Sequence, residues 1–303
     1  MPSPPTQRIP PDTLRRSPRG STAFLLPWAP ACYRRGLAIT AAAAALSLVA
    51  VLSSFSPGWC QWIHGGFVVL AAATALLGAA RRLPIQNVVV AGLMIGATSL
   101  VILVAIQSPD LIAEPDDGSS LGPWILGRLP WQVPLWWMAL LFSSRETARL
   151  LLRPWRRNRH YGYWLIAIAA ALATLADAAF QPFGLHAAQW WEWKGRTPRL
   201  AWHGYPAPAF LATFACSAVL LAFVTPWLIR KRPLAPSPTW DSAALWILLN
   251  LYLLIGNAAR GLLAPAALTL LAIAAIAALG WRNSTASVSP PTVPAPDAPV
   301  EAG

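Results

Sequence analysis

Charged residues are scarce in this sequence, and their scarcity indicates the class of protein. Of the 303 residues only 11% are charged, whereas 56% are hydrophobic, and the mean hydropathy is +0.50. Soluble domains carry roughly 25% charged residues. A chain this apolar cannot hide its hydrophobic surface in a water-exposed globule. The composition therefore excludes an ordinary soluble domain and indicates an integral membrane protein.

The sequence also lacks the patterns that mark metal and disulfide sites. Its three cysteines, Cys32, Cys60 and Cys216, are odd in number and form no CxxC pair, so neither a structural disulfide nor a cysteine-based metal site is expected. The four histidines form no HxxxH or HExxH motif, which argues against a histidine-based metal centre. We therefore predict a protein without a metal ion or another cofactor.

Motifs for nucleotide chemistry are absent as well. Neither GxxxxGK[ST] nor GxGxxG occurs. The one GxSxG match, at residues 118–122, lies in an acidic loop and not on the strand-to-helix turn that a hydrolase nucleophile requires. The net charge is +12, but no soluble basic domain remains once the apolar runs are set aside. Binding of nucleic acid is therefore not expected.

What the sequence does contain is a series of eight apolar runs between two tails. Residues 1–30 are rich in Pro, Ser and Arg, and residues 283–303 in Pro, Ala, Ser and Val; both predict disorder. Residues 31–282 predict an all-α, polytopic transmembrane bundle of about eight helices. The runs are residues 36–55, 62–80, 88–106, 131–144, 161–180, 208–229, 243–259 and 262–281.

Two of these boundaries are less sharply defined by the sequence. The fourth run is short before its polar end and can extend through residues 145–152. The last two runs meet at Arg260 and Gly261. A tight helical hairpin at that point fits, because Pro265 would occupy the first turn of the second helix. The helix count depends most on this hairpin.

The basic residues predict the orientation in the membrane. With the amino terminus in the cytoplasm, all but five of the 23 Lys and Arg residues fall in cytoplasmic segments. The five exceptions are Arg128, Lys194, Arg196, Arg199 and Arg260. The positive-inside rule therefore predicts that both termini lie in the cytoplasm. We expect a multi-pass protein of a bacterial inner membrane. The arginines are expected to meet the headgroups of membrane lipids.

A single carboxylate stands out within the fifth run. Asp177 lies near the end of the otherwise apolar residues 161–180. An acid in a membrane helix costs about 2.5–3.5 kcal/mol on insertion scales, so it faces protein or a wet cavity. Thr174 and Gln181 share its helix face. That face is either a packing surface on which Asp177 bonds to a neighbouring helix, or a site in which a buried carboxyl donates a proton.

Tryptophans gather just beyond Asp177, around another acid, Glu192. An aromatic belt at the membrane interface explains indoles at this level, but their clustering also suits the lip of a site for a long apolar ligand. On the second interpretation Asp177 and Glu192 are candidate catalytic residues. The candidate substrate contacts are Trp190, Trp191, Trp193, Trp202, Gln181 and His203.

Other polar residues favour structural roles. Glu146 and Arg149 are spaced to form an ion pair at the end of the fourth helix. Asn250 and Asn257 share a face of the seventh helix, and hydrogen bonds to neighbouring helices are expected for both.

Three sequence blocks have a familiar order and spacing. They are LGP at residues 121–123 with LPWQVPLWW at 129–137; SRETAR at 144–149; and DAAFQP at 177–182, followed by WEW at 191–193, WHGYP at 202–206 and FL at 210–211. Together they resemble the carotenoid biosynthesis membrane-protein family that includes bacterioruberin-type carotenoid hydratases. The resemblance implies an enzyme of carotenoid or isoprenoid metabolism that acts on a long polyene.

The chain departs from that family pattern at several polar positions. Gln181 stands where the pattern has a second Asp, and Ala209 stands where it has Asn. Ala212 and Thr213 replace its closing Gly and Trp, and the acidic residues 109–120 replace an aromatic block. The departures suggest another substrate, or a member without hydratase activity.

Two main functional hypotheses follow. A hydratase protonates a C=C bond to a tertiary carbocation, which water then captures; Asp177 would be the proton donor, Trp191 and Trp193 the π-faces, and Glu192 a water-positioning base. The alternative is a non-catalytic membrane protein that binds a polyene or lipid, or that scaffolds a pathway. A transporter is disfavoured, because no internal repeat or pair of broken helices appears.

Overall fold

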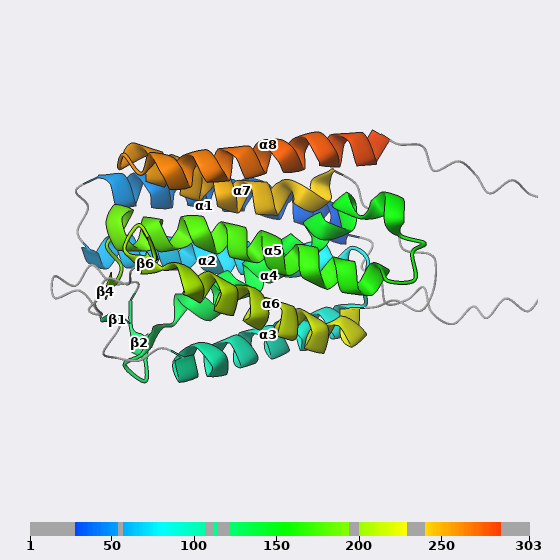
Figure 1. Cartoon of the computed structure of the whole chain (residues 1–303), viewed down its shortest axis with the longest axis horizontal. Helices are drawn as coiled ribbons and strands as arrows, with labels where there is room; N and C mark the ends of the chain where they lie inside the picture. Colours follow the sequence, from blue (N-terminus) through cyan, green and yellow to red (C-terminus); the bar gives the residue numbers. More distant parts are fainter. Residues whose placement is uncertain are drawn as a thin grey trace, which may run out of the picture.

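The computed structural model describes residues 28–53, 57–106, 112–113, 122–193, 200–228 and 240–285. Nearly all of the two predicted tails therefore lies outside the described residues. Within these ranges the chain forms a bundle of long helices (Figure 1). The helices are α1 (Ala29–Leu52), α2 (Pro57–Ala80), α3 (Ile85–Ile106), α4 (Gln132–Leu151), α5 (Tyr161–Pro182), α6 (Ala207–Leu228), α7 (Asp241–Ala259) and α8 (Leu263–Thr285). The predicted all-α helical bundle is confirmed.

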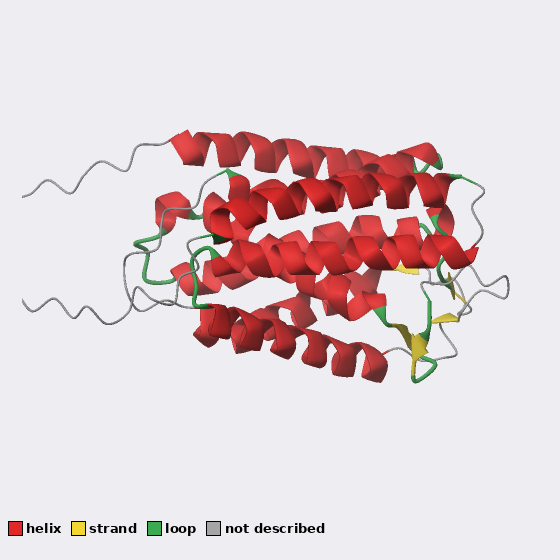
Figure 2. Cartoon of the chain, turned by 180° about the vertical axis from the view of Figure 1, so that it is seen from behind, coloured by secondary structure: helices red, strands yellow, loops and turns green. Residues whose placement is uncertain are grey.

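Short two-residue strands lie together at one end of the bundle (Figure 2). They form three antiparallel pairs: β1 (Ile112–Ala113) with β4 (Glu192–Trp193), β2 (Trp124–Ile125) with β3 (Leu129–Pro130), and β5 (Ala201–Trp202) with β6 (Tyr205–Pro206). We call this the strand end. The opposite end, which holds Arg34, Arg81, Arg82, Arg145 and Arg149, is the arginine end.

Seven of the described helices are long and apolar enough to cross a membrane, namely all except α4. The exception is the inner helix of the bundle. α4 packs against α2, α3, α5, α7 and α8, and nearly all of its side chains are buried. Because protein rather than lipid surrounds α4, it can carry Arg145, Glu146 and Arg149 at its end. The predicted extension of this helix through its polar end is confirmed.

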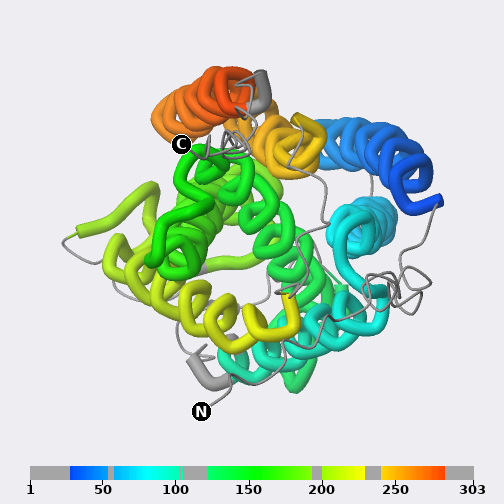
Figure 3. Tube along the Cα trace, turned by 90° about the vertical axis from the view of Figure 1, so that its right-hand side faces the viewer, coloured from blue at the N-terminus to red at the C-terminus, as the bar shows by residue number. Residues whose placement is uncertain are grey.

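The outer helices pack in a simple order. Viewed along the helices, α7 lies between α1 and α8 on one side, and α3 lies beside α6 on the other (Figure 3). The hairpin predicted at Arg260 and Gly261 is present: α7 ends at Ala259, Gly261 has a φ of +73°, and α8 begins at Leu263. α1 begins at Ala29, earlier than the predicted run, with a proline in its first turn.

The predicted structural contacts are partly confirmed. Arg149 Nη1 lies 3.1 Å from Glu146 Oε1, as the spacing predicted. Asn257 Nδ2 donates to the Ala179 carbonyl of α5 at 3.0 Å, which is a bond between helices. For Asn250 the structure shows a bond within its own helix: its Nδ2 donates to the Trp246 carbonyl at 2.9 Å, because a carbonyl one turn earlier lies within reach of a short polar side chain. A bond from Asn250 to a neighbouring helix stays a prediction.

Candidate functional site

Asp177 lies on the face of α5 that packs against α6, near the strand end. Its side chain is 4% exposed. Its Oδ1 accepts a hydrogen bond of 2.9 Å from Gln181 Nε2, and its Oδ2 accepts one of 2.9 Å from Thr213 Oγ1 of α6. The carboxyl is therefore buried between two helices and contacts a donor at each oxygen, as a buried polar group requires.

The two donors come from positions where the chain departs from the family pattern. Gln181 was a predicted site residue, and the structure brings it to Asp177. Thr213 was not predicted as a site residue, because it was noted only as the replacement of a Trp in the family pattern. Nothing else in the sequence of α6 marked Thr213 as a partner of Asp177. Thr174, the third residue on the predicted face, instead donates to the Ala170 carbonyl one turn earlier at 2.9 Å.

An apolar cavity of about 440 Å³ lies beside this carboxyl, open to the outside of the bundle. Its walls come from α5, α6, α8 and the β5 strand. The lining residues are Ala171, Thr174, Leu175, Ala178, Trp202, Ala207, Phe210, Phe214 and Leu268. Its size falls in the range of small-molecule sites.

Asp177 itself is not among the described residues that line the cavity. Thr174 and Ala178, on either side of it in α5, are lining residues, as is Phe214, the neighbour of Thr213. The carboxyl therefore has lining residues as its neighbours on both helices, although it does not itself line the cavity. Thr174 supplies the only hydroxyl among the described lining residues.

Trp202 forms the aromatic cover of the cavity at the strand end. Its indole Nε1 donates to the Ala178 carbonyl at 2.8 Å, which fixes the β5–β6 hairpin onto the end of α5. The turn of this hairpin has positive φ at His203 and at Gly204. His186 Nε2 lies 2.8 Å from the His203 carbonyl, a second link between the hairpin and the segment that follows α5. Burial, and secondarily the charge of His186, lower the pKa of His203.

The hairpin also places Tyr205 near the carboxyl. Burial, and secondarily the negative charge of Asp177, raise the pKa of Tyr205 above its usual range. Its ring packs against Phe210 of the cavity wall, with 5.4 Å between the ring centroids. Tyr205 was not a predicted site residue. The only sequence signal was its place in the WHGYP block.

The other predicted tryptophans lie elsewhere. Trp190 is buried against the rings of His64 and Phe183, with centroid distances of 4.2 and 5.1 Å. Trp191 is buried over Gly184, where an added Cβ would come within 2.2 Å of the indole. Neither lines the cavity. These two indoles belong to the aromatic core of the bundle. Their positions do not support the prediction that the clustered tryptophans together form the lip of the ligand site.

The structure thus divides the predicted site residues into groups. Gln181 bonds to Asp177 near the strand end, Trp202 lines the cavity, and His203 lies beside Trp202 in the β5–β6 turn. Glu192 is exposed in β4 and does not line the cavity, and the side chain of Trp193 lies outside the described residues. The described residues include no group of three or more His, Cys, Asp or Glu that could hold a metal ion.

These features define a polytopic membrane protein with a buried acid beside an apolar cavity. A family model described as carotenoid biosynthesis protein matches residues 62–276, which is more than half of the chain and includes the whole site. The chain belongs to this family, as the sequence blocks predicted, and is a membrane protein of carotenoid metabolism. Searches of the curated proteins and of the solved structures give no match.

Proposed function

We propose that this protein adds water to a C=C bond of a long polyene held in the cavity between α5 and α6. The observation that carries the proposal is the burial of Asp177 between α5 and α6, next to residues that line an apolar cavity. A polyene dissolved in the bilayer could enter this open cavity without crossing water. Most of its chain would stay in contact with apolar side chains.

In the proposed reaction the side chains of the cavity wall shift so that the alkene reaches the Asp177 carboxyl, which acts in its protonated form. Transfer of its proton to the less substituted alkene carbon leaves a tertiary carbocation on the other. A water molecule bonds to that carbon and loses a proton to the Asp177 carboxylate, which restores the acid, so that the sum is the addition of one water. The Thr213 hydroxyl can accept from the protonated carboxyl and donate to the ionised one.

The aromatic rings suited to stabilise the cation differ from those predicted. Trp202, Phe210 and Phe214 line the cavity and present π-electrons to a ligand there. Tyr205, close to Asp177, is a candidate to hold the attacking water. A role for Glu192 in positioning water stays a prediction, to which its exposed place in β4 adds no support.

A non-catalytic binding protein is the second candidate function. It is favoured by one specific observation: the described lining of the cavity is apolar except for Thr174 and the Trp202 indole, and the acid itself does not reach it. Such a protein would hold the polyene and release it unchanged.

Expression in a carotenoid-producing host tests both functions. With the wild type we expect a product heavier by one water, measured by mass spectrometry of the pigments. Asp177→Asn should abolish that product, because an amide cannot supply the proton, while protein level and bound polyene are retained. Ala178→Phe should remove both product and bound polyene, because the added ring fills the cavity.

The matched control is Ala222→Phe, which adds the same ring at an exposed position of α6 that does not line the cavity. It should leave the product unchanged. An unaltered product with Asp177→Asn would contradict the mechanism. Polyene that co-purifies without any change of mass, and is lost only with Ala178→Phe, would establish the binding protein instead.

A further inference from the structure

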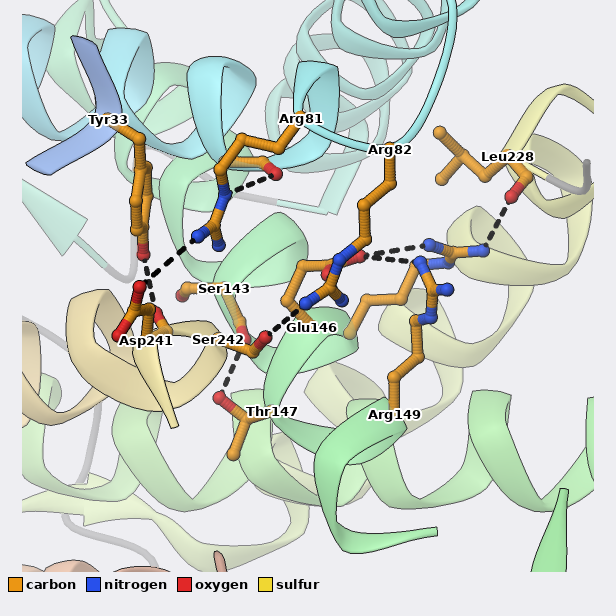
Figure 4. Close-up of polar contacts among 12 residues, drawn as sticks. Tyr33, Arg81, Arg82, Ser143, Glu146, Thr147, Arg149, Leu228, Asp241 and Ser242 are labelled. Carbon is orange, nitrogen blue, oxygen red and sulfur yellow. Dashed lines mark hydrogen bonds and ion pairs between the residues drawn. The ribbon is translucent and has the colours of Figure 1, made fainter. Parts of the chain in front are cut away.

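Three arginines surround one glutamate at the arginine end of the bundle (Figure 4). Arg82, just after α2, lies 2.8 Å from Glu146 of α4. Arg149 and Arg145, both on α4, lie 3.1 and 3.5 Å from the same carboxylate. Arg82 also donates to Ser242 Oγ of α7 at 2.8 Å, and Arg145 donates to the Leu228 carbonyl at the end of α6 at 2.9 Å. We call Arg82, Arg145, Glu146 and Arg149 the arginine cluster.

The arginine cluster is buried and short of negative charge. The side chains of Arg82, Glu146 and Arg149 are 3%, 7% and 14% exposed. Among the described residues three guanidinium groups share one carboxylate, which leaves an excess of two positive charges there. The neighbouring Asp241 does not remove it, because that carboxylate already lies between Arg34 and Arg81. Buried charge without a counter-charge is strongly unfavourable.

Two arginines of this region also lack a hydrogen-bond acceptor for one nitrogen each in the described part of the chain. Arg145 Nε and Arg81 Nη2 are buried without a hydrogen-bond partner among the described residues. The Leu228 carbonyl, at the negative end of the α6 dipole, offers Arg145 only a partial charge.

The space around the arginine cluster limits the direction from which an anion can approach. The inner cavity that touches Arg81, Glu146 and Ser242 measures about 10 Å³, which is room for about one water molecule. A larger anion must therefore approach from outside, at Arg149, the most exposed of the three guanidinium groups. Exposed Trp155, Trp164, Trp227 and Trp281 surround the same end. Tryptophan favours the level of lipid headgroups.

We propose that the arginine cluster binds a phosphate group at the arginine end, carried by an anionic lipid headgroup or by a soluble phosphate. Guanidinium groups form paired hydrogen bonds with phosphate oxygens, and a phosphate would supply the missing negative charge. This site is distinct from the cavity near Asp177 and does not depend on the hydratase proposal.

Thermal unfolding in nanodiscs tests the phosphate site. The protein is compared in phosphatidylcholine alone, in phosphatidylcholine with added phosphatidylglycerol, and in phosphatidylcholine with inorganic phosphate against chloride at equal ionic strength. At saturating anion we expect the midpoint to rise by roughly 5 °C. A rise only with phosphatidylglycerol identifies a lipid headgroup as the source, and a rise only with inorganic phosphate identifies a soluble anion. A rise with both identifies a site that takes either, and no rise in any arm overturns the proposal.

Three variants separate a specific site from diffuse attraction. Arg149→Gln should lose most of the rise, whereas Arg156→Gln, an equal change of charge at an exposed arginine of the same end, should keep it. Glu146→Gln should enlarge the rise, because it increases the excess positive charge. Equal losses with Arg149→Gln and Arg156→Gln would overturn the proposal, as would an unchanged rise with Arg149→Gln. If Glu146→Gln fails to fold, the comparison of Arg149→Gln with Arg156→Gln still tests the proposal.

Discussion

At the scale of single residues, the surroundings of Asp177 show what a linear pattern cannot record. Gln181 and Thr213 are substitutions relative to the family pattern, in which Gln181 replaces an Asp and Thr213 replaces a Trp. In the structure each donates a hydrogen bond of 2.9 Å to the carboxyl. A pattern compares residue types position by position, whereas the chemistry of the acid depends on which side chains reach it from another helix.

The tryptophans illustrate the same limit. Trp190 and Trp202 lie in one loop region and have the same residue type, yet Trp190 is buried against His64 and Trp202 lines the cavity. Clustering in sequence predicted their level in the membrane. It did not predict which indole faces the ligand, because that depends on the path of the β5–β6 hairpin.

Gly256 is a single position where packing leaves no room for a side chain. A Cβ added there would come within 2.1 Å of the Phe183 ring, and that ring packs against Trp190 and Tyr252. We expect Gly256→Ala to lower the free energy of unfolding by about 1–3 kcal/mol, because the ring must move within a filled core. Thermal unfolding of the purified protein in detergent measures the change.

Gly66→Ala provides the control for this substitution. Gly66 also lies inside a long helix, but a Cβ there would meet no atom within 4 Å. Alanine is favoured over glycine in a helix by about 0.8–1.0 kcal/mol, so the control should be neutral or stabilising. Equal stabilities of the two variants would contradict the packing around Phe183.

At the scale of helices, the apolar runs predicted each of the eight long helices in the described ranges, and the end of α4 was the least well defined. Its apolar part ends at residue 144, where Arg145 and Glu146 begin a polar stretch. Hydropathy measures the affinity of a segment for lipid, and α4 contacts protein on nearly every side. The pairing of Glu146 with Arg149 was predictable from spacing within one helix. The closer contact with Arg82 was not, because it depends on how α2 packs beside α4.

Tyr33 connects two outer helices through one hydrogen bond. Its hydroxyl donates to the Asp241 carbonyl at 2.9 Å and so joins α1 to α7. Arg81 lies over the same ring at 3.8 Å, and phenylalanine would keep that contact. We expect Tyr33→Phe to cost about 1 kcal/mol, the usual net contribution of a hydrogen bond, measured by thermal unfolding in detergent.

Tyr163→Phe is the matched control, because Tyr163 is 77% exposed. It removes the same hydroxyl from a surface site and should change stability by less than about 0.5 kcal/mol. A loss of the same size in both variants would show that the bond between α1 and α7 contributes nothing.

At the scale of the whole molecule, the bundle separates its polar groups by end. The eight long helices in the described ranges alternate in direction, which brings the start of α1 and the end of α8 to the same side as the arginine cluster (Figure 1). The positive-inside rule then predicts a cytoplasmic arginine end. This orientation stays a prediction.

Reporter fusions can test the orientation. A fusion at Gly118, between α3 and α4, should report the outer side, and one at Ser237, between α6 and α7, the cytoplasm. Alkaline phosphatase, active only outside, and a fluorescent protein that matures inside give opposite signals. The same signal from both positions would contradict eight spans.

The inner position of α4 has a consequence for how this protein is made. A segment whose last turns carry two arginines and a glutamate has a poor intrinsic tendency to leave the translocon for the bilayer. Its partners α2 and α3 are synthesised before it, whereas α5, α7 and α8 are synthesised after it. The nascent chain must therefore shelter α4 against earlier helices until later ones emerge, so that membrane insertion and tertiary assembly proceed together.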